Sequence, residues 1–342
     1  MPNPFYDREE RRIRSLLRII IHAALFIVLV SVAVLLISPI ALAGYNAPPT
    51  SEEIAADKAF TALATVASLV VMTFMMWLMG HFIDRRNFTD FGLWVAQRMW
   101  WRDLAFGLAL GVVLQGAIFL FQWAVGWIDI TGALVASSGA FATAILLPVI
   151  TYISVGIYEE MLSRGYHLLN FAEGLNSRFI GPRAAVLIAW VLSSLVFGVL
   201  HYFNPESGLM STFNISVAGL FLGLGYILTR SLAIPIGLHI SWNFAQGNIF
   251  GFPVSGTSAG ATFIAIEQGG PELWTGGAFG PEKGMIGLIA IIIGMVITVV
   301  YLRIMYGPLR IQTELAEYTP RKHQQKDTPE TATIPADGQS TA

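Results

Sequence analysis

Runs of about 20 apolar residues recur along the chain as far as Tyr306, and this feature limits the possible folds more than any other. A helix that crosses the hydrocarbon core of a bilayer needs a run of about that length. Only 12% of the residues are charged, compared with about 25% in soluble domains. The sequence therefore predicts an all-α fold, a polytopic integral membrane helical bundle.

The apolar segments predict about eight transmembrane helices. The first segment is longer than the roughly 7–15 apolar residues of a signal peptide, so we expect it to remain in the protein as an anchor. The predicted spans are 19–43, 59–82, 103–127, 141–160, 183–203, 211–229, 233–250 and 284–306.

The spans and a polar tail suggest three regions of the chain. Residues 1–140 hold three spans behind a basic N-terminus, residues 141–310 form a second membrane domain, and residues 311–342 form the tail. The tail is rich in Thr, Gln, Pro and charged residues and lacks apolar periodicity, which is typical of disordered segments. We therefore expect a disordered cytoplasmic tail.

The positive charges predict the orientation of the spans. With the N-terminus in the cytoplasm, all of the 20 Lys and Arg residues except Lys58 and Lys283 fall on the cytoplasmic side, as the positive-inside rule requires. An odd number of spans would remove this asymmetry. We therefore expect an integral protein of a bacterial cytoplasmic membrane, with both termini cytoplasmic.

Composition excludes several classes of function. The chain has no cysteine, which excludes thiolate catalysis, disulfides and cysteine-ligated metals. Its net charge of -2 gives no basic surface for a nucleic acid, so no nucleic-acid partner is expected.

A few polar side chains fall within or at the ends of the apolar spans. An ionisable group inside a membrane costs about 2.5–3.5 kcal/mol on insertion scales, so each one is a candidate functional residue. The candidates are Glu159, Glu160, Arg164, His201 and His239, together with the amides Asn243 and Gln246.

The two adjacent glutamates are expected to have different partners. Glu160 and Arg164 are four residues apart on a helix and can form an ion pair. Glu159 is rotated about 100° from Glu160 and has no such partner on its own helix. The alternative is an ordinary helix end whose charged side chains extend to the interface.

The histidines come from two other helices. His239, Asn243 and Gln246 form a polar stripe on one face of the apolar helix predicted at 233–250. His201 lies near the end of the span predicted at 183–203. Taken singly, such residues are explained by hydrogen bonds between membrane helices. Taken together with Glu159, they suffice for a hydrolytic site.

Two kinds of hydrolytic site remain open. Glu159 can act as a general base toward water while one histidine holds the water and the other, with Asn243, stabilises the oxyanion. Alternatively, Glu159, His201 and His239 can ligate Zn²⁺ and leave a position open for an activated water.

Three motifs follow one another in the order and spacing of a known family. They read Glu159-Glu160-Met-Leu-Ser-Arg164, Phe197-Gly-Val-Leu-His201 and His239-Ile-Ser-Trp-Asn243, and Gly165 follows the arginine. With these motifs, residues of about 141–250 resemble the CPBP family of intramembrane proteases, whose pattern is EExxxR, FxxxH and HxxxN or HxxxD. That family includes type II CAAX prenyl endopeptidases, bacteriocin-processing enzymes and proteins like lysostaphin resistance protein A.

The resemblance implies a CAAX-type intramembrane endopeptidase whose catalytic membrane domain is 141–310. It implies that Glu159 is the catalytic glutamate, that His201 is its partner at the water, and that His239 and Asn243 stabilise the oxyanion or a metal. Glu160 and Arg164 would order the site. Zinc is the implied cofactor if the family's metalloprotease mechanism applies, although a metal-free mechanism has also been argued. The implied partners are membrane lipid and a peptide or membrane-protein substrate.

One geometric condition must hold for this site. With a rise of about 1.5 Å per residue, His201 ends its span near one face of the membrane, whereas His239 begins its span near the other. The two histidines can meet if the helix of 141–160 continues past Arg164 and the next helix starts outside the bilayer, or if residues 204–210 dip inward.

Two other functions are weaker alternatives. Residues Gly256 to Gly260 match G-x-S-x-G, but this motif marks a nucleophile only on a strand-to-helix turn. A non-catalytic scaffold or a transporter could use the same polar cavity for binding. Transporters often have repeated halves with broken helices, and no such repeat is evident here.

Overall fold

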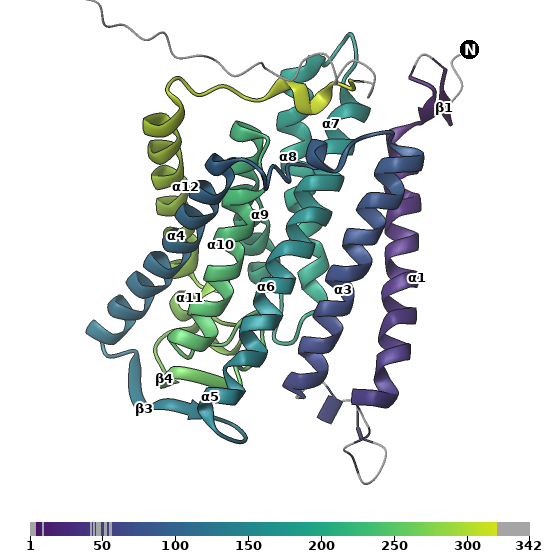
Figure 1. The fold of residues 1–342 in the computed structure, drawn as a ribbon. Helices are drawn as coiled ribbons and strands as arrows, with labels where there is room; N and C mark the ends of the chain where they lie inside the picture. The colour runs from purple at the N-terminus through teal and green to yellow at the C-terminus, as the bar shows by residue number, and fades with distance from the viewer. Residues whose placement is uncertain are drawn as a thin grey trace, which may run out of the picture.

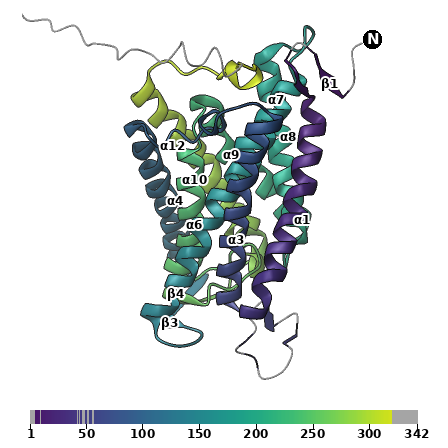
Figure 2. The same cartoon turned by 45° about the vertical axis from the view of Figure 1, so that its right-hand side comes forward.

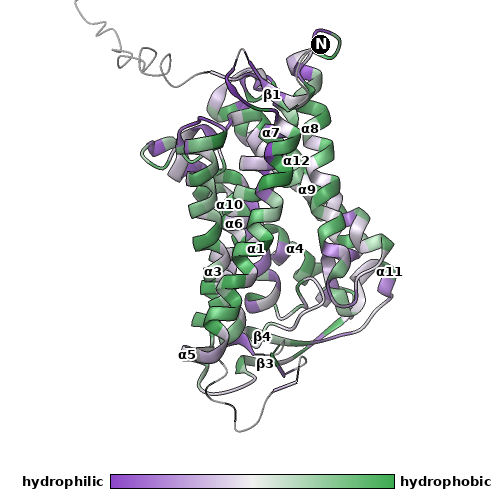
Figure 3. Cartoon of the chain, turned by 90° about the vertical axis from the view of Figure 1, so that its right-hand side faces the viewer, coloured by the Kyte–Doolittle hydropathy of each residue, from purple (hydrophilic) through white to green (hydrophobic). Residues whose placement is uncertain are grey.

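The computed structural model describes residues 5–8, 10–41, 43, 45, 49–50, 53–54 and 57–319. Long helices lie side by side along a common direction, and the N-terminal segment and the end of the described chain are at the same end of the bundle (Figure 1). Apolar residues predominate along these helices, and polar residues are more frequent toward the ends of the bundle (Figure 3).

Seven helices of the described residues are long and apolar enough to cross a membrane. This confirms the predicted all-α membrane bundle and makes the chain an integral membrane protein. The helical segments are Ser15–Pro39 in α1 (Ser15–Ala41), Lys58–Ile83 (α3, Lys58–Leu78, with a π-helical end), Arg98–Ala124 (α4), Phe141–Leu175, Gly181–Phe203, Leu209–Thr229 (α9) and Met285–Tyr306 (α12).

The predicted span 233–250 forms a shorter helix near the centre of the bundle. It consists of α10, Ala233–Phe244, and a π-helical turn, Ala245–Ile249. Small residues let α4 approach this helix closely, because a Cβ atom on Gly107 would lie 2.5 Å from the Ile234 carbonyl oxygen. The close packing buries His239 and the residues that precede it in α10.

The helix that carries the two glutamates is longer than predicted. It begins with α5 (Phe141–Ala144) and α6 (Leu146–Glu160), and continues as a π-helix over Met161–Leu168 and as α7 over Leu169–Leu175. The predicted end at residue 160 is therefore wrong. The polar residues after Glu160 resemble a helix end in the sequence, but Ser163, Arg164 and His167 are buried against other helices. π-Helical segments of this kind are frequent at functional sites.

Strands at one end of the bundle join its two halves. β3 (Ile128–Ala136) precedes the 141–175 helix, and β4 (Ala261–Gln268) lies in the long connection before α12. The strands pair antiparallel, with Ile128 opposite Gln268 and Ala136 opposite Ala261. Figure 2 shows this sheet below the ends of the helices, at the end opposite the N-terminus.

The first residues of the predicted tail are ordered. Thr313–Ala316 form a 3₁₀ turn, Leu315 and Ala316 are buried, and the Gln312 backbone N–H donates to the Ile227 carbonyl at 2.9 Å. Disorder is therefore not observed for residues 311–319, because this segment packs on the bundle. Residues 320–342 of the tail lie outside the described residues.

Arginines tie the N-terminal segment to the same end of the bundle. Arg12, Arg18 and Arg86 each pair with the buried carboxylate of Glu173, and Arg18 also pairs with Asp84 at 2.6 Å. Residues 1–140 are thus bound to residues 141–310 by charge as well as by packing. The boundaries drawn between the three regions stay a prediction.

Candidate active site

Glu160 connects two of the predicted motifs. Its Oε1 accepts a hydrogen bond from Arg164 Nη1 at 2.8 Å, as the four-residue spacing predicts, and lies 2.8 Å from His239 Nδ1. Arg164 Nη2 donates to the Gly219 carbonyl of α9 at 2.9 Å. Glu160, Arg164 and His239 are all buried. Hydrogen bonds among three separate helices therefore replace the water that this ion pair lacks.

Phe197 packs against the charged side chains of this network. It lies on α8 (Gly181–Leu200), one turn before His201, and the Arg164 guanidinium stacks over its ring at 4.6 Å. The ring also contacts both imidazoles, with centroid distances of 4.5 Å to His201 and 6.0 Å to His239. Phe197 therefore fixes the positions of both histidines relative to the arginine.

Glu159 points in a different direction from Glu160. Its Oε2 lies 3.9 Å from His239 Nε2 and 4.0 Å from His201 Nε2, while its Oε1 accepts a 3.2 Å hydrogen bond from the Tyr158 hydroxyl. None of the described residues donates a hydrogen bond to Oε2. The structure thus brings the carboxylate and both predicted histidines together.

The hydrogen bonds of the two imidazoles assign their protons. His201 Nδ1 lies 2.8 Å from the Phe197 carbonyl oxygen, and His239 Nδ1 lies 2.8 Å from the Glu160 carboxylate. Both partners only accept, so each Nδ1 carries the proton and donates it. In the neutral imidazoles, each Nε2 is then an acceptor that faces Glu159 Oε2.

The longer helix at 141–175 satisfies the geometric condition set by the sequence. Glu159 lies well inside this helix because it continues past Arg164 to Leu175. His201 lies just after α8, in the 3₁₀ turn His201–Phe203, so the middle of the 141–175 helix is beside the end of α8. The histidines from α8 and α10 therefore meet at one point.

Two cavities meet at the histidines. A cavity of about 230 Å³, here called the polar cavity because most of the residues that line it are of polar types, is bordered by Glu159 and by one face of α6, which includes Thr151, Tyr152 and Val155. A smaller cavity of about 50 Å³ lies on the other side, among apolar side chains of α8, α9, α10 and α12. The residues that line both cavities are His201, His239, Asn243 and Ser255.

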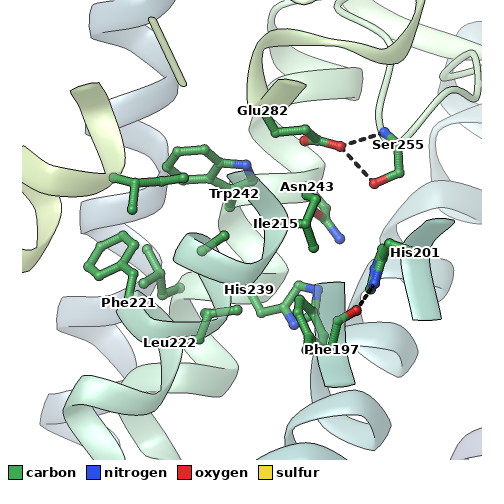
Figure 4. Close-up of a pocket in the computed structure, with 13 residues that line it drawn as sticks. Phe197, His201, Ile215, Phe221, Leu222, His239, Trp242, Asn243, Ser255 and Glu282 are labelled. Carbon is green, nitrogen blue, oxygen red and sulfur yellow. Dashed lines mark hydrogen bonds between the residues drawn. The ribbon is translucent and has the colours of Figure 1, made fainter. Parts of the chain in front are cut away.

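Asn243 is part of the same group. It lies one helical turn after His239 on α10, and Figure 4 shows its side chain beside His239, pointing toward the space between the two imidazoles. Its amide can therefore donate to a substrate that occupies either cavity.

Two other candidates from the sequence have structural roles. Gln246 Nε2 donates to the Pro253 carbonyl at 2.6 Å, and its Oε1 accepts from Gln115 at 2.9 Å, so this amide joins helices and a loop. The Gly256–Gly260 motif precedes a strand and follows a helix, which is not the strand-to-helix turn of a serine nucleophile.

Sequence analysis did not predict Glu282 and Ser255 as site residues. Glu282, in the turn Pro281–Lys283, lines the apolar cavity, and it accepts hydrogen bonds from Ser255. A glutamate in a Gly-rich polar connection is ordinary, so nothing in the sequence distinguished it from Glu267 or Glu272.

A metal suits the chemical types of the three side chains but not their present spacing. Two imidazoles and a carboxylate are ligands of catalytic zinc, with bonds of about 2.0–2.2 Å. Tetrahedral ligands at that distance are roughly 3.3 Å apart, whereas the separations here are 3.9 and 4.0 Å. In the part of the chain that the structure describes, no group of three or more His, Asp or Glu side chains is arranged to hold a metal ion.

A comparison with protein families finds a match in the segment that carries the site residues. Residues 141–245 match the family model described as type II CAAX prenyl endopeptidase Rce1-like. No significant match was found among curated proteins or among solved structures. The matched segment contains Glu159, His201, His239 and Asn243, and it supports a CAAX-type membrane protease in general terms. Over these 105 of its 342 residues, the chain is thus similar to the type II CAAX prenyl endopeptidase Rce1-like family.

Proposed function

We propose that this chain is an intramembrane endopeptidase in which Glu159 activates a water molecule for attack on a peptide bond. The observation that carries the proposal is the convergence of three proton acceptors: the Nε2 atoms of His201 and His239 lie 4.0 and 3.9 Å from Glu159 Oε2. Acceptors at this separation are suited to share a donor such as water.

The hydrolytic step follows from the proton positions. Glu159 Oε2 takes a proton from the water, and the oxygen attacks the carbonyl carbon of the substrate. The C–N bond then breaks as the leaving nitrogen receives this proton from the Glu159 carboxyl, directly or through His201 Nε2. The products are a carboxylic acid and an amine, which exchange a proton to give a carboxylate and an ammonium group.

The oxyanion of the intermediate requires donors on the other side of the carbonyl. The Asn243 amide can donate there directly. His239 can donate through Nε2 once it carries a second proton, because Glu160 at Nδ1 stabilises the resulting imidazolium. Arg164 holds Glu160 in place for this purpose through a 2.8 Å hydrogen bond.

The two cavities suit a substrate with polar and apolar parts. The polar cavity gives water a route to Glu159, and the apolar cavity offers space for a hydrophobic group next to the scissile bond. We therefore expect a peptide or a segment of a membrane protein as substrate, with membrane lipid around the enzyme.

The decisive experiment replaces Glu159 by Gln in the full-length protein reconstituted in liposomes. Cleavage of a prenylated CAAX peptide should fall by at least about 100-fold, which is the contribution of a general base, while the melting temperature is unchanged. Glu267→Gln, at an exposed position of β4, is the matched control. A non-catalytic scaffold would tolerate the isosteric change at Glu159, and cleavage that persists in Glu159→Gln would disprove the proposal.

A further inference from the structure

The loop 253–259, between the π-helical turn of α10 and β4, borders the proposed active site. Val254, Ser255, Thr257, Ser258 and Ala259 line the polar cavity, and Ser255 also lines the apolar cavity. The other residues that line both cavities are His201, His239 and Asn243. Ser255 therefore lies at the junction of the two cavities, although it belongs to none of the family motifs.

Ser255 is held in an unfavourable backbone conformation. Its φ angle is +48°, in the left-handed region that residues other than glycine and asparagine rarely adopt. Such a conformation persists only where the surroundings enforce it. The contacts of Ser255 provide that constraint.

Both hydrogen-bond donors of Ser255 are directed at one atom. Its backbone N–H donates to Glu282 Oε1 at 2.6 Å, and its hydroxyl donates to the same oxygen at 2.7 Å (Figure 4). Glu282 is 2% exposed and lies in the turn that leads into α12. The loop is thus bound to the start of a transmembrane helix through a single buried carboxyl group.

Close backbone contacts place the loop against the segment that follows His201. The Gly256 N–H donates to the Phe279 carbonyl at 2.9 Å. A Cβ atom on Gly256 would lie 1.9 Å from the Pro205 carbonyl oxygen, so this approach requires glycine. Any displacement of the loop therefore changes the wall of both cavities next to His201.

A second contact holds the far end of the loop. Lys58 Nζ, at the start of α3, donates to the Ser258 carbonyl at 2.7 Å. This bond is partly exposed, and its loss leaves no buried group without a partner. The buried contact between Ser255 and Glu282 is accordingly the stronger of the two.

The proposed hydrolytic step does not use Glu282. It lies on the apolar cavity, whereas Glu159 lies on the polar cavity. Burial raises the pKa of Glu282 above its ordinary value, against the effects of hydrogen bonds from Ser255 and Gln246 and of nearby His201. A buried carboxyl group is costly unless it makes hydrogen bonds, which suggests a definite role for this residue.

We propose that Glu282 is a positioning residue of the active site, which holds loop 253–259 through Ser255 as the wall between the polar and apolar cavities. The proposal rests on the proposed protease function. A fixed wall determines how a peptide enters beside Glu159, so release of the loop weakens substrate binding and leaves the chemical step largely intact.

Two substitutions of Glu282 separate this role from others. Glu282→Gln keeps an oxygen at the position of Oε1 and can accept both hydrogen bonds of Ser255, whereas Glu282→Ala accepts neither. We expect KM for the prenylated CAAX peptide to rise about tenfold in Glu282→Ala, with kcat changed less than twofold, and to be restored in Glu282→Gln. A tenfold change corresponds to about 1.4 kcal/mol of binding free energy.

Two further variants refine the comparison. Ser255→Ala removes the hydroxyl and keeps the backbone N–H, so its KM should lie between those of the wild type and Glu282→Ala. Glu272→Ala is the matched control, because Glu272 is an exposed glutamate of the same connection that pairs with Lys283 at 2.9 Å. Its kinetic constants should equal those of the wild type.

A second measurement needs no substrate. The chain lacks cysteine, so a single cysteine can be introduced at Val254, which is 4% exposed. If Glu282→Ala shifts the equilibrium between the held and the released loop about tenfold, maleimide should label Val254→Cys at least about tenfold faster in that background. With Glu282→Gln, Val254→Cys should react at its original rate. A cysteine at exposed Leu273 should react at the same rate in all backgrounds.

These outcomes distinguish the proposal from its alternatives. An unchanged labelling rate in Glu282→Ala would overturn it, and equal impairment of Glu282→Gln and Glu282→Ala would assign Glu282 a role through its charge. Failure of the protease function itself is detected separately by Glu159→Gln, because the labelling experiment does not depend on cleavage.

Discussion

His239 and Glu160 are joined by a 2.8 Å hydrogen bond through Nδ1 of the imidazole, although they are 79 residues apart in the chain. The bond turns Nε2 of His239 toward Glu159, the neighbour of Glu160 in the sequence. The two adjacent glutamates therefore divide the functions of the site. In the proposed mechanism, Glu160 orients His239 and stabilises its imidazolium form, and Glu159 faces the reacting water.

Isosteric changes at these two glutamates should have different effects on stability. Glu160→Gln removes the charge that balances buried Arg164. A buried charge left without its partner strongly destabilises the folded protein. We expect a lower melting temperature together with a loss of kcat/KM of roughly 10–100-fold, as for other carboxylates that orient a functional histidine. Glu159→Gln should lose activity without losing stability.

Thermal unfolding and peptide cleavage, measured on both variants in the same detergent, test this division. If Glu160→Gln melts at the wild-type temperature, the pair with Arg164 does not have the structural role assigned to it.

Phe197 gives a second prediction, because its ring lies against Arg164 and both histidines. Phe197→Leu keeps an apolar side chain but removes a desolvated cation–π contact, which is worth about 2 kcal/mol. We expect a lower melting temperature and a lower kcat for peptide cleavage.

The chain offers a matched control for Phe197. Arg178 stacks over Phe179 at the same distance, 4.6 Å, but Phe179 is 82% exposed. Phe179→Leu should leave both measurements unchanged. Equal effects of the two substitutions would show that the cation–π contact in the site is not special.

Sequence patterns predicted the parts of this molecule that depend on local spacing. The apolar runs predicted the seven helices that are long and apolar enough to cross a membrane, although the eighth predicted span, 233–250, forms a shorter helix. The four-residue spacing predicted the pair of Glu160 and Arg164. The end of the glutamate helix was placed at residue 160, and its continuation past Arg164 was raised only as a condition for the site, because Arg164 and His167 become buried only through contacts with other helices. Local sequence carries no information about such burial.

The missed part of the site has the same origin. Ser255 and Glu282 are 27 residues apart, in a connection where polar residues are common. Their hydrogen bonds depend on the packing of α12 against α9 and on the turn before α12, which no periodicity indicates. The three family motifs could be recognised because each spans at most six consecutive residues. The contact between Ser255 and Glu282 joins two distant segments, so no short motif contains it.

Metal removal is a third test of the mechanism. The wide spacing of Glu159, His201 and His239 favours water as their common partner. We therefore expect 1,10-phenanthroline and EDTA to leave cleavage unchanged, and elemental analysis of the purified protein to find less than about 0.1 zinc per chain, since a catalytic zinc would be present at one per site. Loss of activity on chelation, with recovery on addition of Zn²⁺, would show that the three side chains close around a metal.

The ionisation of Glu282 gives a prediction for stability as a function of pH. Burial raises the pKa of this carboxyl group in the folded protein above its ordinary value in the unfolded chain. Below the ordinary value, both states are protonated and the full stabilising contribution of the neutral group is present. As the pH rises through the raised pKa, the folded protein must ionise a buried group, and that contribution is lost.

Glu282→Gln isolates this contribution because the amide cannot ionise and still accepts the hydrogen bonds of Ser255. The melting temperature of the wild type relative to Glu282→Gln should therefore fall as the pH rises above the ordinary pKa of glutamate, because burial raises the pKa of this carboxyl group. Glu272→Gln, which changes an exposed carboxylate, should show no such trend. A wild type that instead gains stability over the variant as the pH rises would mean that the Ser255 hydrogen bonds and His201 outweigh burial, and that Glu282 holds the loop as a carboxylate.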